Sequence, residues 1–258
     1  MTMRTVRLKD VVLGEGPPKV IVPITGTTAD EVLAGAEALT PHEIDIVEWR
    51  VDFLGTAPDV GAAVALAGPL AARLGGRGLL ATFRTADEGG EKAISAQDYV
   101  ALNSALIDSG HVDAVDVEFF RGPQVVREVI DAAHARAVAV VASNHDLDAT
   151  PSTEEIVSRL RRMQEAGADV PKLACTPHDT GDLLTLLSAT WLMSAHHADR
   201  PIITMSMGRE GMLSRMTGAF FGSAATFGMV GRPSAPGQIP VGELNRILGL
   251  LGEWAPEH

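Results

Sequence analysis

The stretch AVAVVASNHDLDATPSTEEIVSRLRRMQEAGADVPKLA, residues 137–174, holds one full copy of the pattern that decides the fold. It opens with the Val-rich run 137–143 and closes with the apolar run 169–174, both typical of strands buried on two faces. Between them, Ser152 and Glu155 have capping-box spacing ahead of apolar residues at helical intervals. The stretch therefore predicts a strand, a helix and a second, parallel strand.

The same alternation runs along the rest of the chain. Segments with helical periodicity separate the apolar runs; Thr28 and Glu31 repeat the capping spacing, Asp182 is expected to open an apolar helix, and 242–254 forms the last helix. The eight predicted strands are 19–25, 44–51, 78–84, 113–119, 137–143, 169–174, 201–207 and 222–228.

Eight strands alternating with helices favour a (β/α)8 TIM barrel, an α/β fold of about 250 residues. No Pro-, Gly- or Ser-rich linker divides the chain, so we expect one domain spanning residues 1–258. The segment before Lys19 fits a small N-terminal hairpin that closes the barrel bottom. A doubly wound open sheet is the alternative, weakened because no GxGxxG follows the first predicted strand.

Composition excludes several classes of protein. A formal net charge of −12 offers no basic excess for a phosphate backbone, so general nucleic-acid binding is disfavoured. No apolar stretch approaches the ~20 residues of a membrane span, and no signal-peptide core is present at the N-terminus. Cys175 is the only cysteine, and neither CxxC nor HExxH occurs. We therefore expect a cytoplasmic protein without a membrane partner or metal.

In a (β/α)8 barrel the functional groups stand at the C-terminal ends of the strands. Lys172 is the sharpest signal there, because it interrupts the apolar strand VPKLAC in a chain with four lysines and seventeen arginines. Burial lowers the pKa of a lysine, and a neutral amine can attack a carbonyl. The alternative is a structural lysine that pairs with an acid or extends toward solvent.

His145 follows the preceding strand, so a barrel sets it beside the end of the Lys172 strand. An imidazole next to a Schiff-base lysine is a natural proton carrier. Alone, His145 would more often be a loop histidine bonded to backbone; its coincidence with Lys172 favours the catalytic interpretation.

Three arginines, Arg50, Arg84 and Arg215, follow strands at the same rim. Each can make fork-like hydrogen bonds to a carboxylate or hydroxyls, which suggests a small anionic substrate. Glu48 and Glu88 are the expected acid partners for some of them. Elsewhere, Met205 and Met207 either line the pocket or fill core, and core is favoured. Trp49 and Trp191 are expected to serve packing.

With these residues in hand, the chain resembles the type I 3-dehydroquinate dehydratases over nearly its whole length. The shared motifs are EWRVD at 48–52, ATFRT at 81–85, SNHD at 143–146, PK at 171–172, ITMSMG at 203–208, SR at 214–215, FGSAATFG at 221–228 and SAPGQ at 234–238.

The resemblance implies a barrel, usually a homodimer, that works without metal or organic cofactor. It implies syn elimination of water from the small-molecule substrate 3-dehydroquinate to give 3-dehydroshikimate, the third step of the shikimate pathway toward chorismate and the aromatic amino acids. The family's Schiff-base lysine falls on Lys172, its acid–base histidine on His145 and the supporting carboxylate on Glu88. Its substrate-contacting positions fall on Glu48, Arg50, Arg84, Arg215, Ser234 and Gln238.

Two other functions stay open. A class I aldolase on the same barrel also needs a strand lysine, and Gly208 and Gly211 are placed to cradle the phosphate of its typical substrates. A degenerate barrel acting as a binding partner is the non-enzymatic alternative. It predicts loss of a catalytic group, whereas Lys172 and His145 are both present.

Overall fold

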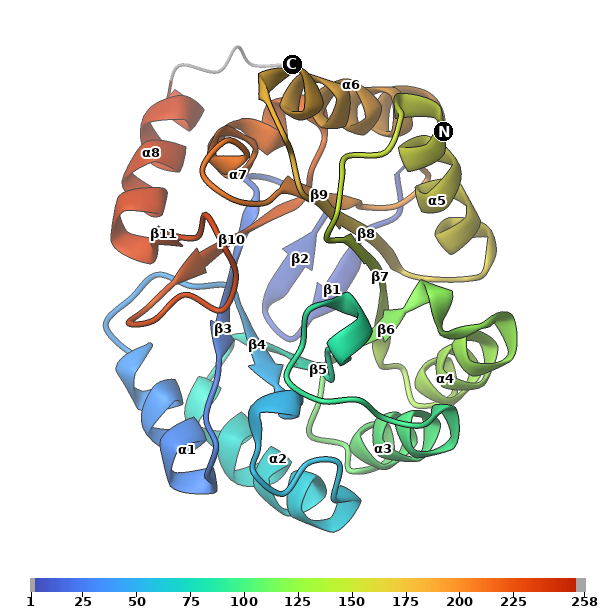
Figure 1. The fold of residues 1–258 in the computed structure, drawn as a ribbon. Coiled ribbons are helices and arrows are strands. Elements are labelled where there is room, and N and C mark those ends of the chain that lie inside the picture. The colour runs from blue at the N-terminus through green and yellow to red at the C-terminus, as the bar shows by residue number, and fades with distance from the viewer. Residues whose placement is uncertain (1–2, 254–258) are drawn as a thin grey trace.

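The computed structural model describes residues 3–253, and in it eight parallel strands close into a barrel (Figure 1). In chain order they are β3 (Lys19–Ile24), β4 (Ile46–Arg50), β5 (Gly78–Thr82), β6 (Ala114–Glu118), β7 (Ala139–Asp146), β8 (Val170–Cys175), β9 (Ile203–Ser206) and β10 (Ala225–Met229). β10 pairs with β3, and a bridge between Ile202 and Ser223 joins the β9 and β10 edges. The (β/α)8 prediction is confirmed, and the open-sheet alternative is wrong.

A helix follows each barrel strand, and together the helices form the outer ring seen in Figure 1. They are α1 (Ala29–Ala38), α2 (Val60–Leu74), α3 (Ala96–Asp108), α4 (Pro123–Ala135), α5 (Thr153–Glu165), α6 (Thr180–His196), α7 (Met212–Thr217) and α8 (Val241–Glu253). Short 3-10 turns η1 (Val51–Phe53), η2 (Ala86–Glu88), η3 (Phe119–Arg121) and η4 (Gly218–Phe221) extend four connections, and β11 (Ile239–Pro240) lies beside β10. None of the described helices is long and apolar enough to cross a membrane.

Local hydrogen bonds set the helix starts. The predicted caps at Thr28 and Ser152 form, each side chain accepting from the backbone N–H three residues on. The expected start at Asp182 is wrong, because α6 begins at Thr180 with Asp179 as its cap. The Asp182 carboxylate accepts instead from the backbone N–H of His178.

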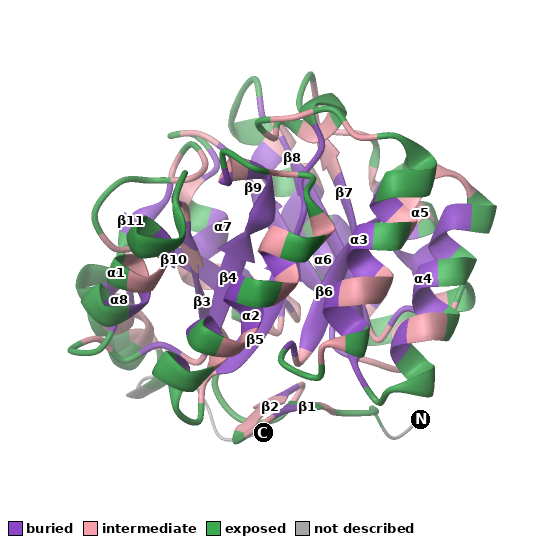
Figure 2. Ribbon diagram, turned by 90° about the horizontal axis from the view of Figure 1, so that it is seen from below, coloured by how far each residue is buried: buried purple, intermediate pink, exposed green. Residues whose placement is uncertain are grey.

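The predicted N-terminal hairpin is present as β1 (Val6–Leu8) and β2 (Val11–Leu13), an antiparallel pair. Figure 2 shows it beyond one end of the barrel. Leu8 and Leu13 are buried and cluster with apolar side chains that point into the barrel from the lower halves of the strands. The hairpin therefore closes the bottom of the barrel and removes apolar surface from water.

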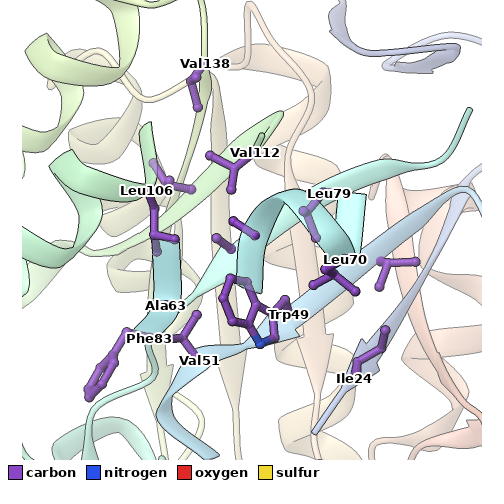
Figure 3. Close-up of a cluster of buried hydrophobic side chains, with 14 of the residues drawn as sticks. Ile24, Trp49, Val51, Ala63, Leu70, Leu79, Phe83, Leu106, Val112 and Val138 are labelled. Atoms are coloured by element: carbon purple, nitrogen blue, oxygen red, sulfur yellow. The ribbon is translucent and has the colours of Figure 1, made fainter. Parts of the chain in front are cut away.

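Strand alternation divides the side chains into two sets. Those pointing outward, such as Trp49 and Leu79, pack against helix residues such as Leu70 and Leu106 (Figure 3). Those pointing inward are apolar near the hairpin and become polar toward the C-terminal ends, as in β6, where Ala114 is followed on one face by Asp116 and Glu118. Trp49 is packed as predicted, but Trp191 is 53% exposed, so its predicted packing role is wrong.

Candidate active site

A cavity opens at the C-terminal ends of the strands, and all nine side chains predicted for the site line it. Period-two alternation carries most of them there, because they continue the inward-facing rows of β4, β5, β7 and β8. The nine are Glu48, Arg50, Arg84, Glu88, His145, Lys172, Arg215, Ser234 and Gln238. Residues far apart in the chain thus meet around one space.

Lys172 lies in the middle of β8 and is 3% exposed. Its Nζ is 3.4 Å from Oδ2 of Asp116, 3.7 Å from Oε1 of Glu48 and 4.8 Å from the centre of the Phe227 ring. The lysine thus pairs with acids, as the structural alternative requires, while its amine also faces the cavity. The two carboxylates place negative charge where a cation on this nitrogen would stand.

His145 and Glu88 form a close pair beside Lys172. β7 runs on to Asp146, so His145 lies within the strand and not in a loop. In the register of β7 and β8, Ser143 pairs with Lys172 and His145 with Ala174, which sets the imidazole one layer above the amine. His145 Nδ1 is 3.0 Å from Oε2 of Glu88, and that oxygen also accepts from the His145 backbone N–H at 2.9 Å.

Burial and nearby positive charges disfavour the protonated form of this imidazole. Burial, with the positive charges of Arg84, Lys172 and Arg50, holds the pKa of His145 well below its ordinary value. Burial raises the pKa of Glu88 to about 7, opposed mainly by Arg84. Because Nδ1 faces Glu88, Nε2 is the nitrogen left to accept a proton in the cavity.

Two of the arginines are held by carboxylates. Arg84 lies 2.9 Å from Asp116, 3.0 Å from Glu118 and 3.5 Å from Glu88, so the expected Glu88 pairing is present. Arg50 makes a bidentate pair with Asp52 at 2.8 and 2.7 Å. Glu48, the other expected acid partner, accepts instead from Thr82 at 3.0 Å and faces Lys172.

Arg215, from α7, is different. It is 2% exposed, and no carboxylate of residues 3–253 lies within 4 Å of its guanidinium. Nη2 donates to the Pro236 carbonyl at 3.1 Å, Nη1 meets only the Met205 sulfur at 3.7 Å, and Nε has no partner. Burial lowers the pKa of Arg215 to about 10, so the group remains charged at neutral pH and presents unused donors to an anion.

Ser234 and Gln238 belong to the segment that links β10 to β11 and borders the cavity. The Ser234 N–H donates to Oε1 of Gln238 at 2.8 Å, which folds the segment on itself. The Pro236 carbonyl accepts from Arg215 and from the Gly208 N–H. Gly237 has φ +77°, and a Cβ there would lie 2.2 Å from the Gly208 oxygen, so only glycine permits this approach.

The sequence analysis missed several groups at the site. Asp116 is fully buried between Arg84, Lys172 and Ser143, whose hydroxyl donates to it at 2.6 Å. The signal was present in AVDVE (114–118), where two acids share one face of an apolar strand. Met205 and Met207 belong to a buried apolar cluster, as expected, and they also border the cavity. Among residues 3–253, no cluster of three or more His, Cys, Asp or Glu side chains is arranged to hold a metal ion.

Comparison with known proteins identifies the family of this chain. The family model described as type I 3-dehydroquinase matches residues 20–254. The 3-dehydroquinate dehydratase of Salmonella agona (strain SL483) is 49% identical over 249 residues, covering 96% of this chain and 99% of that protein. The crystal structure of type I 3-dehydroquinate dehydratase from Clostridium difficile with covalently modified comenic acid has a TM-score of 0.96 at 46% identity, covering 98% of this chain and 100% of that one. The 3-dehydroquinate dehydratase from Enterococcus faecalis has a TM-score of 0.89 at 44% identity, covering 95% and 98%. The chain therefore belongs to the type I 3-dehydroquinase family.

Proposed function

We propose that the protein eliminates water from 3-dehydroquinate to give 3-dehydroshikimate through an imine on Lys172, the third step of the shikimate pathway. The observation that carries the proposal is the buried amine of Lys172 in a cavity that also holds the imidazole of His145. The family relatives supply the substrate, because the named enzymes are 3-dehydroquinate dehydratases.

Substrate orientation is assigned to the charged rim. The unpaired guanidinium of Arg215 takes the ring carboxylate, since this is the cavity cation without a carboxylate partner among residues 3–253. Glu48, Arg50 and Arg84 orient the ring hydroxyls, and the segment carrying Ser234 and Gln238 covers the bound ring.

Imine formation begins with loss of a proton from Lys172 and attack of its amine on the ring ketone. A proton equivalent to the one that Lys172 released goes to the carbinolamine hydroxyl, which leaves as water, and a carbon–nitrogen double bond with a positive charge remains. Asp116 and Glu48 face Nζ before the reaction and face the same nitrogen as an iminium. The charge on the nitrogen is therefore stabilised by groups that need not move.

His145 then performs both proton transfers of the elimination. Nε2 removes a proton from the carbon next to the iminium, which gives an enamine. The enamine expels the hydroxyl on the following carbon, and the protonated imidazole returns the proton to that oxygen, so water leaves. One imidazole serves both steps when the two groups leave from the same face, as in a syn elimination. Water finally hydrolyses the conjugated iminium, frees Lys172 and replaces the water lost at the first step.

The aldolase alternative depended on Gly208 and Gly211 holding a phosphate. The Gly208 N–H donates to the Pro236 carbonyl, and a Cβ on Gly211 would lie 2.4 Å from the Ser206 backbone. Gly211 therefore serves close packing, whereas Gly208 has a φ of +71° and uses its N–H within the chain. No observation favours a phosphorylated substrate.

The test is intact-protein mass spectrometry after borohydride reduction with 3-dehydroquinate, followed by peptide mapping. We expect one reduced adduct, on Lys172, in the wild type and in Lys9→Ala, a control lysine near the barrel bottom that pairs with Asp113. Lys172→Ala should lose both the adduct and turnover, whereas His145→Ala should keep the adduct and lose turnover. A folded wild type that forms no adduct would refute the imine.

A further inference from the structure

We propose that Asn144 and Arg159 are positioning residues that keep Glu88 ionised behind His145; the inference rests on the proposed function. Asn144 precedes His145 on β7, so strand alternation turns its side chain away from the substrate cavity. The side chain is buried and lines a second, outer pocket. Glu88 and His145 border both pockets, and the pair therefore separates the substrate from this outer space.

The orientation of the Asn144 amide is fixed by Arg159 of α5. Arg159 Nη1 donates to Oδ1 of Asn144 at 2.9 Å, and a guanidinium cannot accept a hydrogen bond. The amide NH2 must therefore face the other way, where Nδ2 lies 3.4 Å from Oε1 of Glu88. Arg159 is itself held by Asp146 at 3.0 Å and by Glu155 at 2.7 Å.

The two oxygens of Glu88 have different donors. Oε2 accepts from the His145 backbone N–H and lies 3.0 Å from Nδ1, while Oε1 accepts from Asn144 alone among residues 3–253. Hydrogen bonds to a carboxylate favour its charged form. Because burial brings Glu88 close to half ionisation at neutral pH, the loss of one donor changes the ionised fraction directly.

The other charged neighbours do not replace this donor. Arg84 favours ionised Glu88 from the segment that follows β5, whereas Glu118 and Asp116 oppose it from β6. The remaining charged or titratable groups around the pair are Asp87 on η2, Arg121 on η3, Asp146 on β7, Arg159 on α5, Lys172 on β8, Glu48 and Arg50 on β4 and Arg215 on α7. Arg121 pairs with Asp87 at 3.6 Å.

Ionised Glu88 matters because it decides which imidazole nitrogen carries the proton. A carboxylate accepts the Nδ1 proton of neutral His145 and leaves the Nε2 lone pair free for the substrate. A protonated Glu88 donates to Nδ1, so the hydrogen of the neutral ring moves to Nε2, where it blocks proton abstraction. Asn144 and Arg159 thus act on the reaction through Glu88 without touching the substrate.

The decisive variant is Asn144→Leu, which keeps the side-chain size and removes the donor. We expect the lower apparent pKa of the kcat/KM profile for 3-dehydroquinate to rise by about half to one unit, as a lost hydrogen bond to a charged group predicts. Activity at pH 9 should stay within about twofold of the wild type. Arg159→Gln should shift the profile in the same direction by less. The control Arg161→Gln, on the same helix but in an exposed pair with Glu165, should leave it unchanged.

A uniform loss of activity at every pH, with the apparent pKa unmoved, would assign Asn144 to packing and overturn the proposal. If Asn144→Leu does not fold, the Arg159→Gln profile decides by the same criterion. NMR titration of the labelled His145 ring gives a readout that needs no turnover. If the His145 titration of the variant differs from that of the wild type but the wild type is inactive on 3-dehydroquinate, the positioning role is supported and the proposed function is refuted. If the titration is the same in both and the wild type is active, the positioning role is refuted and the proposed function is supported.

Discussion

Arg215→Met is expected to strengthen the unliganded fold while it disables the enzyme. The guanidinium is buried, lacks a carboxylate within 4 Å among residues 3–253 and leaves Nε without a partner. Methionine keeps most of the aliphatic stem beside Met205 and removes the buried charge. The two effects have opposite signs because the charge serves the ligand and not the fold.

The magnitudes follow from the contacts. Removing an unsatisfied buried polar group should raise the free energy of unfolding by about 1–3 kcal/mol. Losing the hydrogen bond to Pro236 should lower it by about 1 kcal/mol. The variant should therefore gain about 1 kcal/mol in the free energy of unfolding, or about 2–4 °C in Tm for a chain of this size. Breaking a buried ion pair with the substrate carboxylate costs about 3 kcal/mol or more, a loss of about 10²–10³-fold in kcat/KM.

Two measurements check this prediction. Thermal unfolding without ligand should give the higher Tm in Arg215→Met, and steady-state kinetics on 3-dehydroquinate should give the lower kcat/KM. An added carboxylate-bearing analogue should raise the Tm of the wild type and not that of the variant. A variant that melts below the wild type without ligand would show that Arg215 supports the fold, and the reasoning would be wrong.

Three further predictions concern neighbouring groups. The kcat/KM should fall as pH drops through about 7, because protonation of Glu88 removes the acceptor for His145; a flat pH–rate profile from pH 5 to 9 would contradict this. Asp116→Asn should lower the free energy of unfolding by about 3 kcal/mol in urea titrations and slow adduct formation on Lys172, since a buried counter-charge is lost; wild-type stability would argue against the pairing. Gly237→Ala should raise KM about tenfold with little change in Tm, because its Cβ would strike the Gly208 oxygen and displace the covering segment; an unchanged KM would remove that segment from binding.

Strand pattern and barrel topology made the site predictable. Once the apolar runs are assigned to parallel strands, the polar residues at their C-terminal ends must meet in one ring. This reasoning, joined to the family resemblance, brought Lys172, His145 and Arg215 to one cavity. The C-terminal end of β7 was harder to predict, because the polar sequence SNHD is typical of a loop. Pairing with β8 extends the strand through His145 to Asp146 and fixes the imidazole on a rigid element.

Sequence spacing could not predict which acidic side chain pairs with which basic side chain inside the barrel. Glu48 and Arg50 share one face of β4, yet Arg50 turns to Asp52 and Glu48 faces Lys172 across the barrel. The choice depends on register between strands and on which charges the interior already holds. The exposure of Trp191 on α6 could not be predicted either, because apolar residues lie all around that helix and its sequence marks no clear outer face.

The distribution of charge in the cavity explains how one ring orientation is selected. Carboxylates compensate Arg50, Arg84 and Lys172, and Glu48 and Glu88 add negative charge to the same walls. A substrate carboxylate is repelled along most of this surface and attracted at Arg215, whose charge is uncompensated among residues 3–253. Fixing the carboxylate there fixes which ring carbon reaches Lys172. The unpaired, buried guanidinium of Arg215 thus destabilises the fold and at the same time selects the orientation of the substrate. For this reason Arg215→Met should raise the free energy of unfolding and weaken substrate binding.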